Sequence, residues 1–447
     1  MTRKPFLTLL VTIIGSGVVL LDGTVVNLAL PALTKELGAS FSQLQWIVDG
    51  FLLSLSALIL LGGSLGDIFG RKKVYMFGLV GFGLASIACG LAPTPEFLIA
   101  MRVLQGVFGA LVVPGGLAII NTNFTASDRS RAIGRWAAWS GIAAALGPLV
   151  GGYLIDALSW RWIFFINVPF IVVCLVLAAG NVQESVRATG RRVDIVGASL
   201  AMAFLAGITY GLIEGPASGW DGWSVGALVA GFVLLAAFVV VELKRRDPMV
   251  DLRLFKSRNF SGANIMTFAM YGALSGFFFA LVLYLQNVLG YTSTMAGLVL
   301  LPVTLFLLFF SGKMGGLTDT FGPRIFMTIG PALAGLGMLL LLPLGPGANI
   351  FLHVLPGIVL FGIGLVLLVA PLTVTVMSSV DDAHSGIASG INNAVSRAAG
   401  LIVIALLGLL GSGSYQFSVG LCAALAFFAA AVSFLSIRNP KKRPQKV

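Results

Sequence analysis

Long runs of apolar residues constrain this chain more strongly than any other feature of its sequence. An α-helix needs about 20 apolar residues to cross the hydrocarbon core of a bilayer. Open strands and loops cannot face lipid, because their backbone groups would lack hydrogen-bond partners, and the runs do not alternate as barrel strands do. We therefore predict an all-α polytopic membrane protein. Its 14 transmembrane helices are predicted over residues 6–31, 44–66, 73–92, 96–120, 133–157, 162–180, 194–214, 223–243, 260–287, 293–312, 324–344, 350–378, 386–411 and 415–437.

The charged residues support this prediction and indicate an orientation. Only 10% of the residues are charged, against roughly 25% in soluble domains. Of the 28 Lys and Arg residues, we assign 25 to one side, Arg397 among them, two to the other side, and Arg102 to the interior of a span. Lys and Arg accumulate on the cytoplasmic side, so both termini are predicted to be cytoplasmic. The net charge of +11 then reflects topology, and we expect the lipid bilayer, not nucleic acid, as a partner.

An internal repeat relates the two halves of the chain. Residues 63–72 (GSLGDIFGRK) recur as residues 315–324 (GGLTDTFGPR), with five identities at a constant offset of 252. Both copies are predicted to lie in a short cytoplasmic loop after an even-numbered span. Two chance Gly–Asp turns are the alternative, but the equivalent topological positions argue against it. Parallel repeats about an axis normal to the membrane are typical of transporters.

Five passages resemble motifs of one known family. They are residues 21–31 (LDGTVVNLALP), the repeat passage 63–73, residues 102–106 (RVLQG), residues 147–152 (GPLVGG) and residues 160–169 (WRWIFFINVP). Together they resemble the major facilitator superfamily and, within it, the fourteen-helix drug:proton antiporters. The likeness extends over essentially the whole chain.

This resemblance implies two six-helix bundles around a central cavity, with two extra helices inserted between them. The implied domains are an N-terminal bundle (1–185), the inserted helices (186–244), a cytoplasmic linker (245–258), a C-terminal bundle (259–437) and a basic cytoplasmic tail (438–447). The implied location is the bacterial cytoplasmic membrane, and we expect a monomer.

Three ionisable residues are candidates for proton coupling. Asp22 lies well inside the first span, where a carboxylate is costly unless it is protonated or paired. Burial favours the neutral acid and a nearby cation favours the carboxylate, so a conformational change can switch it. Arg102 is the predicted partner, directly or through Gln105, because a guanidinium in a membrane needs partners or water. Asp49 is either a second protonation or cation-attracting site or an interfacial residue that reaches water.

These residues also have purely structural interpretations. Asp22 can be a packing or capping aspartate, and Arg102 can be a fixed donor to backbone carbonyls. The sequence leaves these alternatives open.

The repeat passage is predicted to latch the two bundles together on the cytoplasmic side. Asp67 would accept hydrogen bonds from donors at a neighbouring helix start, and the glycines would permit a tight turn. A basic loop that only sets topology is the alternative. The members of this gating motif are Gly63, Gly66, Asp67, Gly70 and Arg71, with Asp319 and Arg324 in the second copy.

The fifth span carries two rows of small residues. Gly147 and Gly151 form one row at a spacing of four, and Pro148 and Gly152 form the next. Such rows let another helix approach closely, and proline permits a bend. We predict a hinged seam that opens and closes; ordinary membrane packing is the alternative.

The substrate cavity is predicted to be lined by amides and aromatic rings among apolar side chains, since the C-terminal half has no carboxylate clearly inside a span. Such a lining describes an adaptable apolar site more than a sugar or phosphate site. The predicted lining residues are Asn27, Gln105, Asn264, Tyr271, Tyr284, Gln286, Asn392 and Asn393.

Together these features predict a proton-coupled antiporter that exports lipophilic, cationic drugs or related amphiphiles from the cytoplasm or inner leaflet by alternating access. The expected partner is a small amphiphilic substrate, and the proton is the coupling ion. We expect no enzyme activity, cofactor or metal, because the glycine-rich runs lack a phosphate-loop lysine and the cysteines lack metal-ligand spacing. The alternatives are a dedicated exporter of a single metabolite, antibiotic or lipid, and a membrane sensor that does not transport.

Overall fold

The computed structural model describes residues 3–185, 193–245, 248–381, 385–409 and 414–439. The regular secondary structure of these residues is helical. The elements are α1 (Arg3–Leu37), α2 (Phe41–Phe69), α3 (Arg71–Gly90), α4 (Pro95–Asn123), α5 (Ala126–Ala157), α6 (Trp162–Phe165), α7 (Asn167–Asn181), α8 (Ile195–Ser218), α9 (Gly222–Lys244), the 3-10 helix η1 (Leu252–Lys256), α10 (Arg258–Asn287), α11 (Ser293–Phe321), α12 (Pro323–Leu340), the π-helical turn η2 (Ile350–Val354), α13 (Leu355–Ser378), α14 (Ser385–Leu409) and α15 (Tyr415–Ser436).

Thirteen of the described helical segments are long and apolar enough to cross a membrane. Two of them are composite, because α6 continues into α7 and η2 continues into α13. Helix α5, with 32 residues, packs along α1 and α11 and supplies the fourteenth span. The predicted all-α membrane fold is confirmed, and most helices end within a few residues of the predicted bounds.

Local sequence signals explain where several helices begin. The Ser40 side chain caps α2 by accepting a hydrogen bond from the Gln43 backbone N–H, and the Gln43 side chain accepts one from the Ser40 backbone N–H. This is the reciprocal pattern of a capping box. Thr94 caps α4 in a similar way, with Pro95 in the first turn, where proline costs no hydrogen bond. Such caps satisfy the free N–H groups at a helix start.

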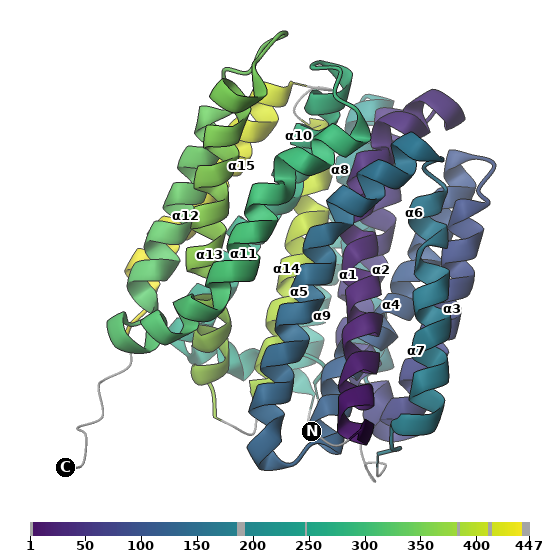
Figure 1. Cartoon of the computed structure of the whole chain (residues 1–447), viewed down its shortest axis with the longest axis vertical. Coiled ribbons are helices and arrows are strands. Elements are labelled where there is room, and N and C mark those ends of the chain that lie inside the picture. The colour runs from purple at the N-terminus through teal and green to yellow at the C-terminus, as the bar shows by residue number, and fades with distance from the viewer. Residues whose placement is uncertain (1–2, 186–192, 246–247, 382–384, 410–413, 440–447) are drawn as a thin grey trace.

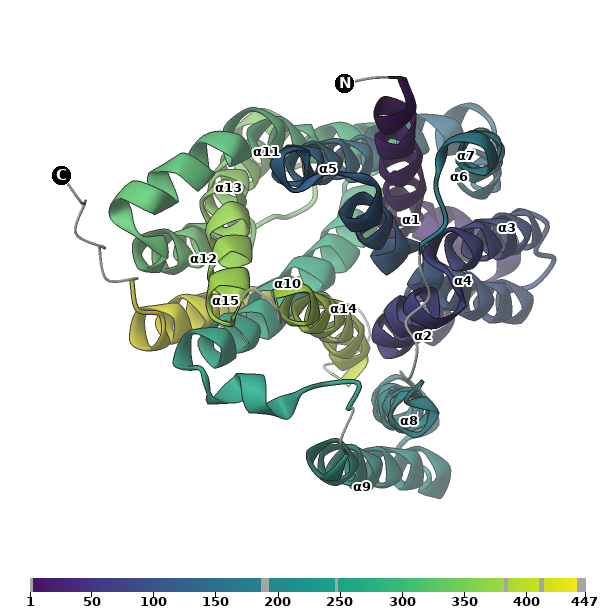
Figure 2. The same ribbon diagram turned by 90° about the horizontal axis from the view of Figure 1, so that it is seen from below.

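The helices form two bundles with an attached hairpin (Figures 1 and 2). Helices α1–α7 make up the N-terminal half and α10–α15 the C-terminal half, each with its own apolar core. Helices α8 and α9 pack on each other outside the bundles, and α8 touches α2 and α14, one helix from each half. Helix α1 begins at the bottom of Figure 1. We call this the inner end, as the charge pattern predicts, and the opposite end the outer end.

The halves meet mainly along two helix pairs, α2 with α14 and α5 with α11. At the outer end of the second pair, Asp156 accepts hydrogen bonds from the backbone N–H groups of Ser293 and Thr294 at 3.0 and 2.7 Å. On the first pair, Gln45 Nε2 donates to the Ile404 carbonyl oxygen at 2.5 Å. These bonds hold the halves together at the outer end on both seams.

Candidate functional site

The predicted pairing of Asp22 with Arg102 is present in the N-terminal half. Arg102 Nη1 on α4 donates to Asp22 Oδ2 on α1. Gln105 Nε2 and Asn167 Nδ2 each donate to Asp22 Oδ1 at 2.9 Å. Both amides also donate to Ser86 Oγ on α3, at 2.8 and 3.0 Å. Helices α4 and α7 therefore bond directly to the carboxylate of α1, and α3 joins the same network through Ser86.

This network is sealed from solvent. Asp22 and Gln105 are 0% exposed, and Arg102 and Asn167 are 1% exposed. The guanidinium of Arg102 also donates through Nε to the Ile47 carbonyl oxygen of α2 at 3.1 Å and lies 4.4 Å from the Phe51 ring centroid. A buried ion pair with every carboxylate oxygen bonded is stable only while these donors stay in place, so the position of four helices and the charge of Asp22 are linked.

Two members of this network were missed in the sequence. Asn167 lies inside a quoted motif, and Ser86 is one polar residue in an apolar span. A polar side chain in such a span is a signal that a partner exists. The local sequence does not show that Asn167 bonds to Asp22, because the two residues are 145 positions apart. It also does not show that Ser86 accepts from Asn167 and Gln105.

Asp49 is fully buried in α2, and neither carboxyl oxygen has a hydrogen-bond partner. In this conformation the side chain does not reach water, in contrast to the interfacial alternative. Its role in proton coupling remains a prediction.

The gating motif is a helix end and not a loop, which corrects the sequence prediction. Residues 63–69 continue α2, and only Gly70 breaks the helix, with φ +105°, a backbone conformation that favours glycine. Asp67 forms an ion pair with Arg71 at 2.9 Å, and Arg71 also donates to the Ala118 carbonyl oxygen of α4 at 2.8 Å. These bonds lie within the N-terminal half, and a latch between the bundles remains a prediction.

A residue outside the motif caps the next helix. Glu184 accepts hydrogen bonds from the backbone N–H groups of Lys72 and Lys73 at 3.0 and 3.2 Å. A carboxylate at a helix N-terminus is favourable because it meets free N–H groups and the positive end of the helix dipole. A Cβ on Gly70 would lie 2.7 Å from the Glu184 carboxyl carbon.

The second copy repeats this arrangement. Gly322 breaks the chain between α11 and α12 with φ +80°, and Asn439 accepts a hydrogen bond from the Arg324 backbone at 3.1 Å. Arg324 also donates to the Phe434 carbonyl oxygen of α15. Asn439 thus occupies the place that Glu184 has in the first copy. The side chain of Asp319 lies outside the described residues.

The two rows of small residues in α5 face different helices. A Cβ on Gly147 would lie 2.8 Å from Thr24 Oγ1 on α1, and one on Gly151 only 1.7 Å from a Val25 methyl group. In the other row, a Cβ on Gly152 would lie 2.4 Å from the Ser293 carbonyl oxygen of α11. The first row therefore fixes α5 in its own half, and the second lies on the seam between the halves.

Pro148 completes the seam row. A Cβ added to Gly297 of α11 would lie 2.3 Å from the Pro148 carbonyl oxygen. Gly152 of α5 faces the α11 backbone, and Gly297 of α11 faces the α5 backbone. The small residues permit this close approach of the two backbones. The close approach was predicted correctly, and the opening of this seam remains a prediction.

Comparison with known proteins identifies the family. The sequence profile of the Major Facilitator Superfamily matches residues 12–404 and, in a second match, residues 263–447. This chain belongs to the Major Facilitator Superfamily. The puromycin resistance protein of Streptomyces alboniger is 36% identical over 413 residues, which cover 91% of this chain and 82% of that protein. The multidrug resistance protein Stp of Mycobacterium tuberculosis is 34% identical over 410 residues, which cover 91% and 76%.

A solved structure of the superfamily shares the fold. The inward-open xylose transporter XylE of E. coli aligns with a TM-score of 0.70 over 98% of both chains, at 16% sequence identity. The resemblance carried by the five sequence passages is confirmed, and the superfamily arrangement of two bundles agrees with Figure 2.

The predicted lining residues of the superfamily cavity have several different positions. Gln105 belongs to the buried Asp22 network instead of a cavity wall. Asn392 Nδ2 donates to Asn264 Oδ1 at 3.1 Å, so these two amides bond α14 to α10 inside one half. Gln286 bridges the halves, because its Nε2 donates to the Leu28 carbonyl oxygen of α1 at 3.0 Å. Polar groups in a membrane bundle find partners on neighbouring helices, which removes these amides from a free cavity surface.

The remaining four differ in exposure. Asn27 donates to the Thr24 carbonyl oxygen at 3.4 Å, and its buried Oδ1 lacks a partner. Asn393 is exposed. Tyr271 lies beside Arg397. Tyr284 lines a cavity and donates to the Leu344 carbonyl oxygen at 2.7 Å.

Arg397 was assigned to an inner segment from the sequence, and the structure corrects this. It lies in the middle of α14, which runs from Ser385 to Leu409. It is partly buried, and its Nε has no hydrogen-bond partner. Arg102 is therefore not the only arginine deep in the membrane-spanning region.

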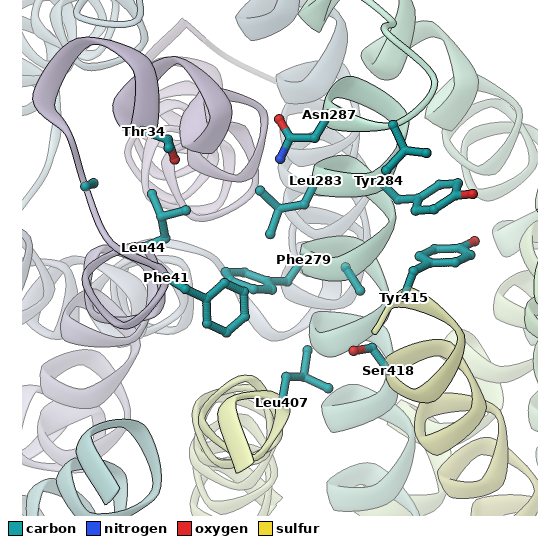
Figure 3. A pocket seen from close by; sticks show the side chains of 13 residues that line it. Thr34, Phe41, Leu44, Phe279, Leu283, Tyr284, Asn287, Leu407, Tyr415 and Ser418 are labelled. Atoms are coloured by element: carbon teal, nitrogen blue, oxygen red, sulfur yellow. The ribbon is translucent and has the colours of Figure 1, made fainter. Parts of the chain in front are cut away.

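A cavity of about 360 Å³ opens between the halves at the outer end (Figure 3). Phe41 meets Phe279 edge-on with ring centroids 5.9 Å apart, and Tyr284 stacks on Tyr415 at 4.0 Å. None of the described residues that line it is charged, which suits an apolar or aromatic molecule. They are Thr34, Ala39, Phe41, Leu44, Phe279, Ala280, Leu283, Tyr284, Asn287, Val288, Leu407, Tyr415 and Ser418.

Proposed function

We propose that this protein is a proton-coupled antiporter that exports lipophilic, cationic drugs or related amphiphiles by alternating access. Membership of the Major Facilitator Superfamily supports transport. Two relatives are named for resistance to puromycin and to multiple drugs, which supports export. The substrate would enter from the cytoplasm or the inner leaflet, and the protein would work as a monomer in a bacterial cytoplasmic membrane with both termini inside.

The single observation that carries the coupling is the sealed Asp22 network. In this conformation the carboxylate is bonded by three side chains, of Arg102, Gln105 and Asn167. Both carboxyl oxygens accept hydrogen bonds, and the side chain is closed off from solvent. A proton can reach Asp22 only when these donors withdraw. Since the donors come from α4 and α7, protonation and helix movement become one event.

The proton gradient is sufficient for useful export. One charge crossing a potential of 100 mV gains roughly 2.3 kcal/mol. That free energy corresponds to a concentration ratio of about 50, because about 1.4 kcal/mol is tenfold. No nucleotide hydrolysis is then needed.

The contacts between the halves suit such a cycle. The outer ends are joined by the Asp156 and Gln45 hydrogen bonds, and the small-residue row of α5 lets the seam close without side chains in between. Alternation would rock one half against the other about this seam.

A dedicated exporter of one compound is the second candidate. The name of the puromycin resistance protein points to a single antibiotic, whereas that of Stp points to many. Export of several chemically unrelated dyes by the purified protein would argue against a dedicated exporter. Export confined to one compound among a broad panel would favour it.

The proposed function is tested with the purified protein in proteoliposomes. An imposed pH gradient should drive movement of tetraphenylphosphonium, a lipophilic cation, and a protonophore should abolish it. Asp22→Asn should abolish the response to the gradient, because the side chain can no longer lose a proton. Proton-driven movement that persists unchanged in Asp22→Asn would remove this residue from the mechanism.

A further inference from the structure

A buried acid lies in the seam between α2 and α14. Asp49 shares one face of α2 with Gln45, four residues before it, and Leu52, three residues after it. Both neighbours meet α14, since a Cβ on Gly408 would lie 2.9 Å from Gln45 Oε1 and one on Gly400 would lie 3.7 Å from Leu52. Asp49 therefore faces α14 between Gly400 and Gly408. It is 0% exposed, and neither carboxyl oxygen is bonded.

Most charged groups on the helices around Asp49 are bonded to other residues or lie near the ends of their helices. Helices α1, α3, α4, α8 and α14 pack against α2. Asp22 and Arg102 bond to each other, Glu96 accepts from Gln43 at 2.6 Å, and Glu214 of α8 accepts from Trp46 at 2.7 Å. The other charged residues of these helices lie near helix ends, with one exception, Arg397 in the middle of α14. Those near helix ends are Arg3 and Lys4 at the inner end of α1, Lys35 and Glu36 at its outer end, Asp67 at the inner end of α2, and Arg71, Lys72 and Lys73 at the inner end of α3.

Arg397 lies on the same seam. It follows Gly390 by seven residues and precedes Gly400 by three, spacings that share one helix face. Both glycines meet α2, at Leu60 and Leu52. The Nε of Arg397 is buried without a partner, and a titratable neighbour of its guanidinium is Tyr271 of α10.

The two groups are close enough to meet after a side-chain movement. Asp49 lies three residues outward of Leu52, and Arg397 lies three residues inward of Gly400, which is opposite Leu52. With a rise of about 1.5 Å per residue, their Cα atoms differ by roughly 9 Å along the seam. The long arginine side chain and the carboxyl group together can span this distance.

An ionised carboxylate without partners is strongly unfavourable at a dry site, whereas the protonated acid is tolerated. We propose that Asp49 carries a proton in this conformation, and that Arg397 takes the place of that proton as the partner of Asp49 when the proton leaves. The inference rests on the proposed proton-coupled function. The O–H bond of the acid breaks, the proton passes to water, and the guanidinium of Arg397 donates hydrogen bonds to the carboxylate that remains.

This exchange couples the acid to the seam. When α2 and α14 part at the outer end, Asp49 meets water and takes up a proton. Closing the seam around it is favourable only for the neutral acid. Loss of the proton then requires Arg397 to move outward along α14, which changes the packing of that seam. Helix α8 touches both α2 and α14. The inserted hairpin would therefore form one wall of the site.

The test is infrared spectroscopy of the purified full-length protein in lipid bilayers, with the carboxylic-acid C=O band followed as a function of pH. Asp49→Asn should remove one band of a protonated acid in a dry environment. Arg397→Gln should shift the pH of half-loss of that band upward by about one unit or more, a tenfold gain in proton affinity. Arg397→Lys keeps a cation at this position, so its pH of half-loss should stay nearer to the wild-type value. Arg253→Gln, which removes a charge from the exposed η1 segment, should cause no shift.

Two results would overturn the proposal. One is a band that survives in Asp49→Asn, and the other is an unchanged pH of half-loss in Arg397→Gln protein that elutes as a folded monomer. Neither depends on transport. Absence of proton-driven tetraphenylphosphonium movement in the wild type would instead refute the proposed function while leaving the infrared result as it stands.

Discussion

Asparagine at position 22 would keep the shape of the Asp22 side chain and remove its charge. Arg102 would remain in place at 1% exposure without an anionic partner. Its other bonds go to neutral oxygens of Gln105 and Ile47. The substitution therefore creates an uncompensated buried charge, which is one of the few mechanisms that give a large loss of stability.

The expected magnitude follows from this burial. Breaking a buried ion pair by removing one partner costs about 3–5 kcal/mol. Replacing both partners by neutral groups removes the stranded charge and is far less harmful. The double variant Asp22→Asn/Arg102→Gln should therefore regain part of the loss, with a coupling free energy of about 2 kcal/mol or more.

The assay is the free energy of unfolding in mixed detergent micelles, measured for the wild type, both single variants and the double variant. Asp221→Asn is the matched control, because Asp221 caps α9 from an exposed position and asparagine caps equally well. The control should change stability by less than about 0.5 kcal/mol. The double variant should stay inactive in proton-driven transport even where its stability recovers.

Additive single effects would refute this reasoning. A coupling free energy below about 0.5 kcal/mol is the value expected of independent sites. Asp22 and Arg102 would then not depend on each other, and the sealed network could not link the charge of Asp22 to the position of α4.

Three further substitutions test other parts of the structure. Gly152→Val adds a side chain at a position where even a Cβ would lie 2.4 Å from the α11 backbone. The variant should hold the outer end of the α5–α11 seam open, which spin labels on the two helices would report as a longer distance. An unchanged distance would contradict the close-packed seam. Gly70→Ala places a Cβ 2.7 Å from Glu184 on a backbone with φ +105°, and it should lower the free energy of unfolding by about 1–3 kcal/mol. The control Gly226→Ala, at a position with open space around it, should not lower it. Equal stabilities of the two variants would reject the strain argument. Leu283→Trp should fill the 360 Å³ outer cavity and raise the KM for bulky substrates more than for small ones, and a uniform effect would argue that substrates do not use this cavity.

Much of the fold could be predicted from the sequence because membrane insertion depends on local composition. Each span is a run of apolar residues, and its length is set by the bilayer. The predicted segment 223–243 and α9 (Gly222–Lys244) agree closely. The repeat also located both helix breaks, at Gly70 and Gly322, because a positive φ favours glycine. It did not reveal that the rest of the passage is helical.

The candidate site could be predicted only in part. A carboxylate and an arginine in apolar spans both demand partners, and this rule alone links Asp22 to Arg102. Asn264 and Asn392 were predicted to line the cavity, whereas in the structure they are bonded to each other. Arg397 was assigned to a cytoplasmic segment, although it lies in the middle of α14. Charge counting indicates a side for each loop but does not fix the depth of a single residue.

The sequence by itself determined the membrane fold, the number of spans, the small-residue rows of α5 and the presence of a buried acid at Asp22. These features depend on residue type and on spacing within one helix. Only the tertiary structure decided which buried groups meet. Asn167 bonds to both Asp22 and Ser86, while Asp49 stays unbonded in a seam with Arg397. The physical reason is that such contacts depend on the rotation and register of helices packed side by side. Many apolar surfaces pack almost equally well, and the sum of all contacts selects one arrangement.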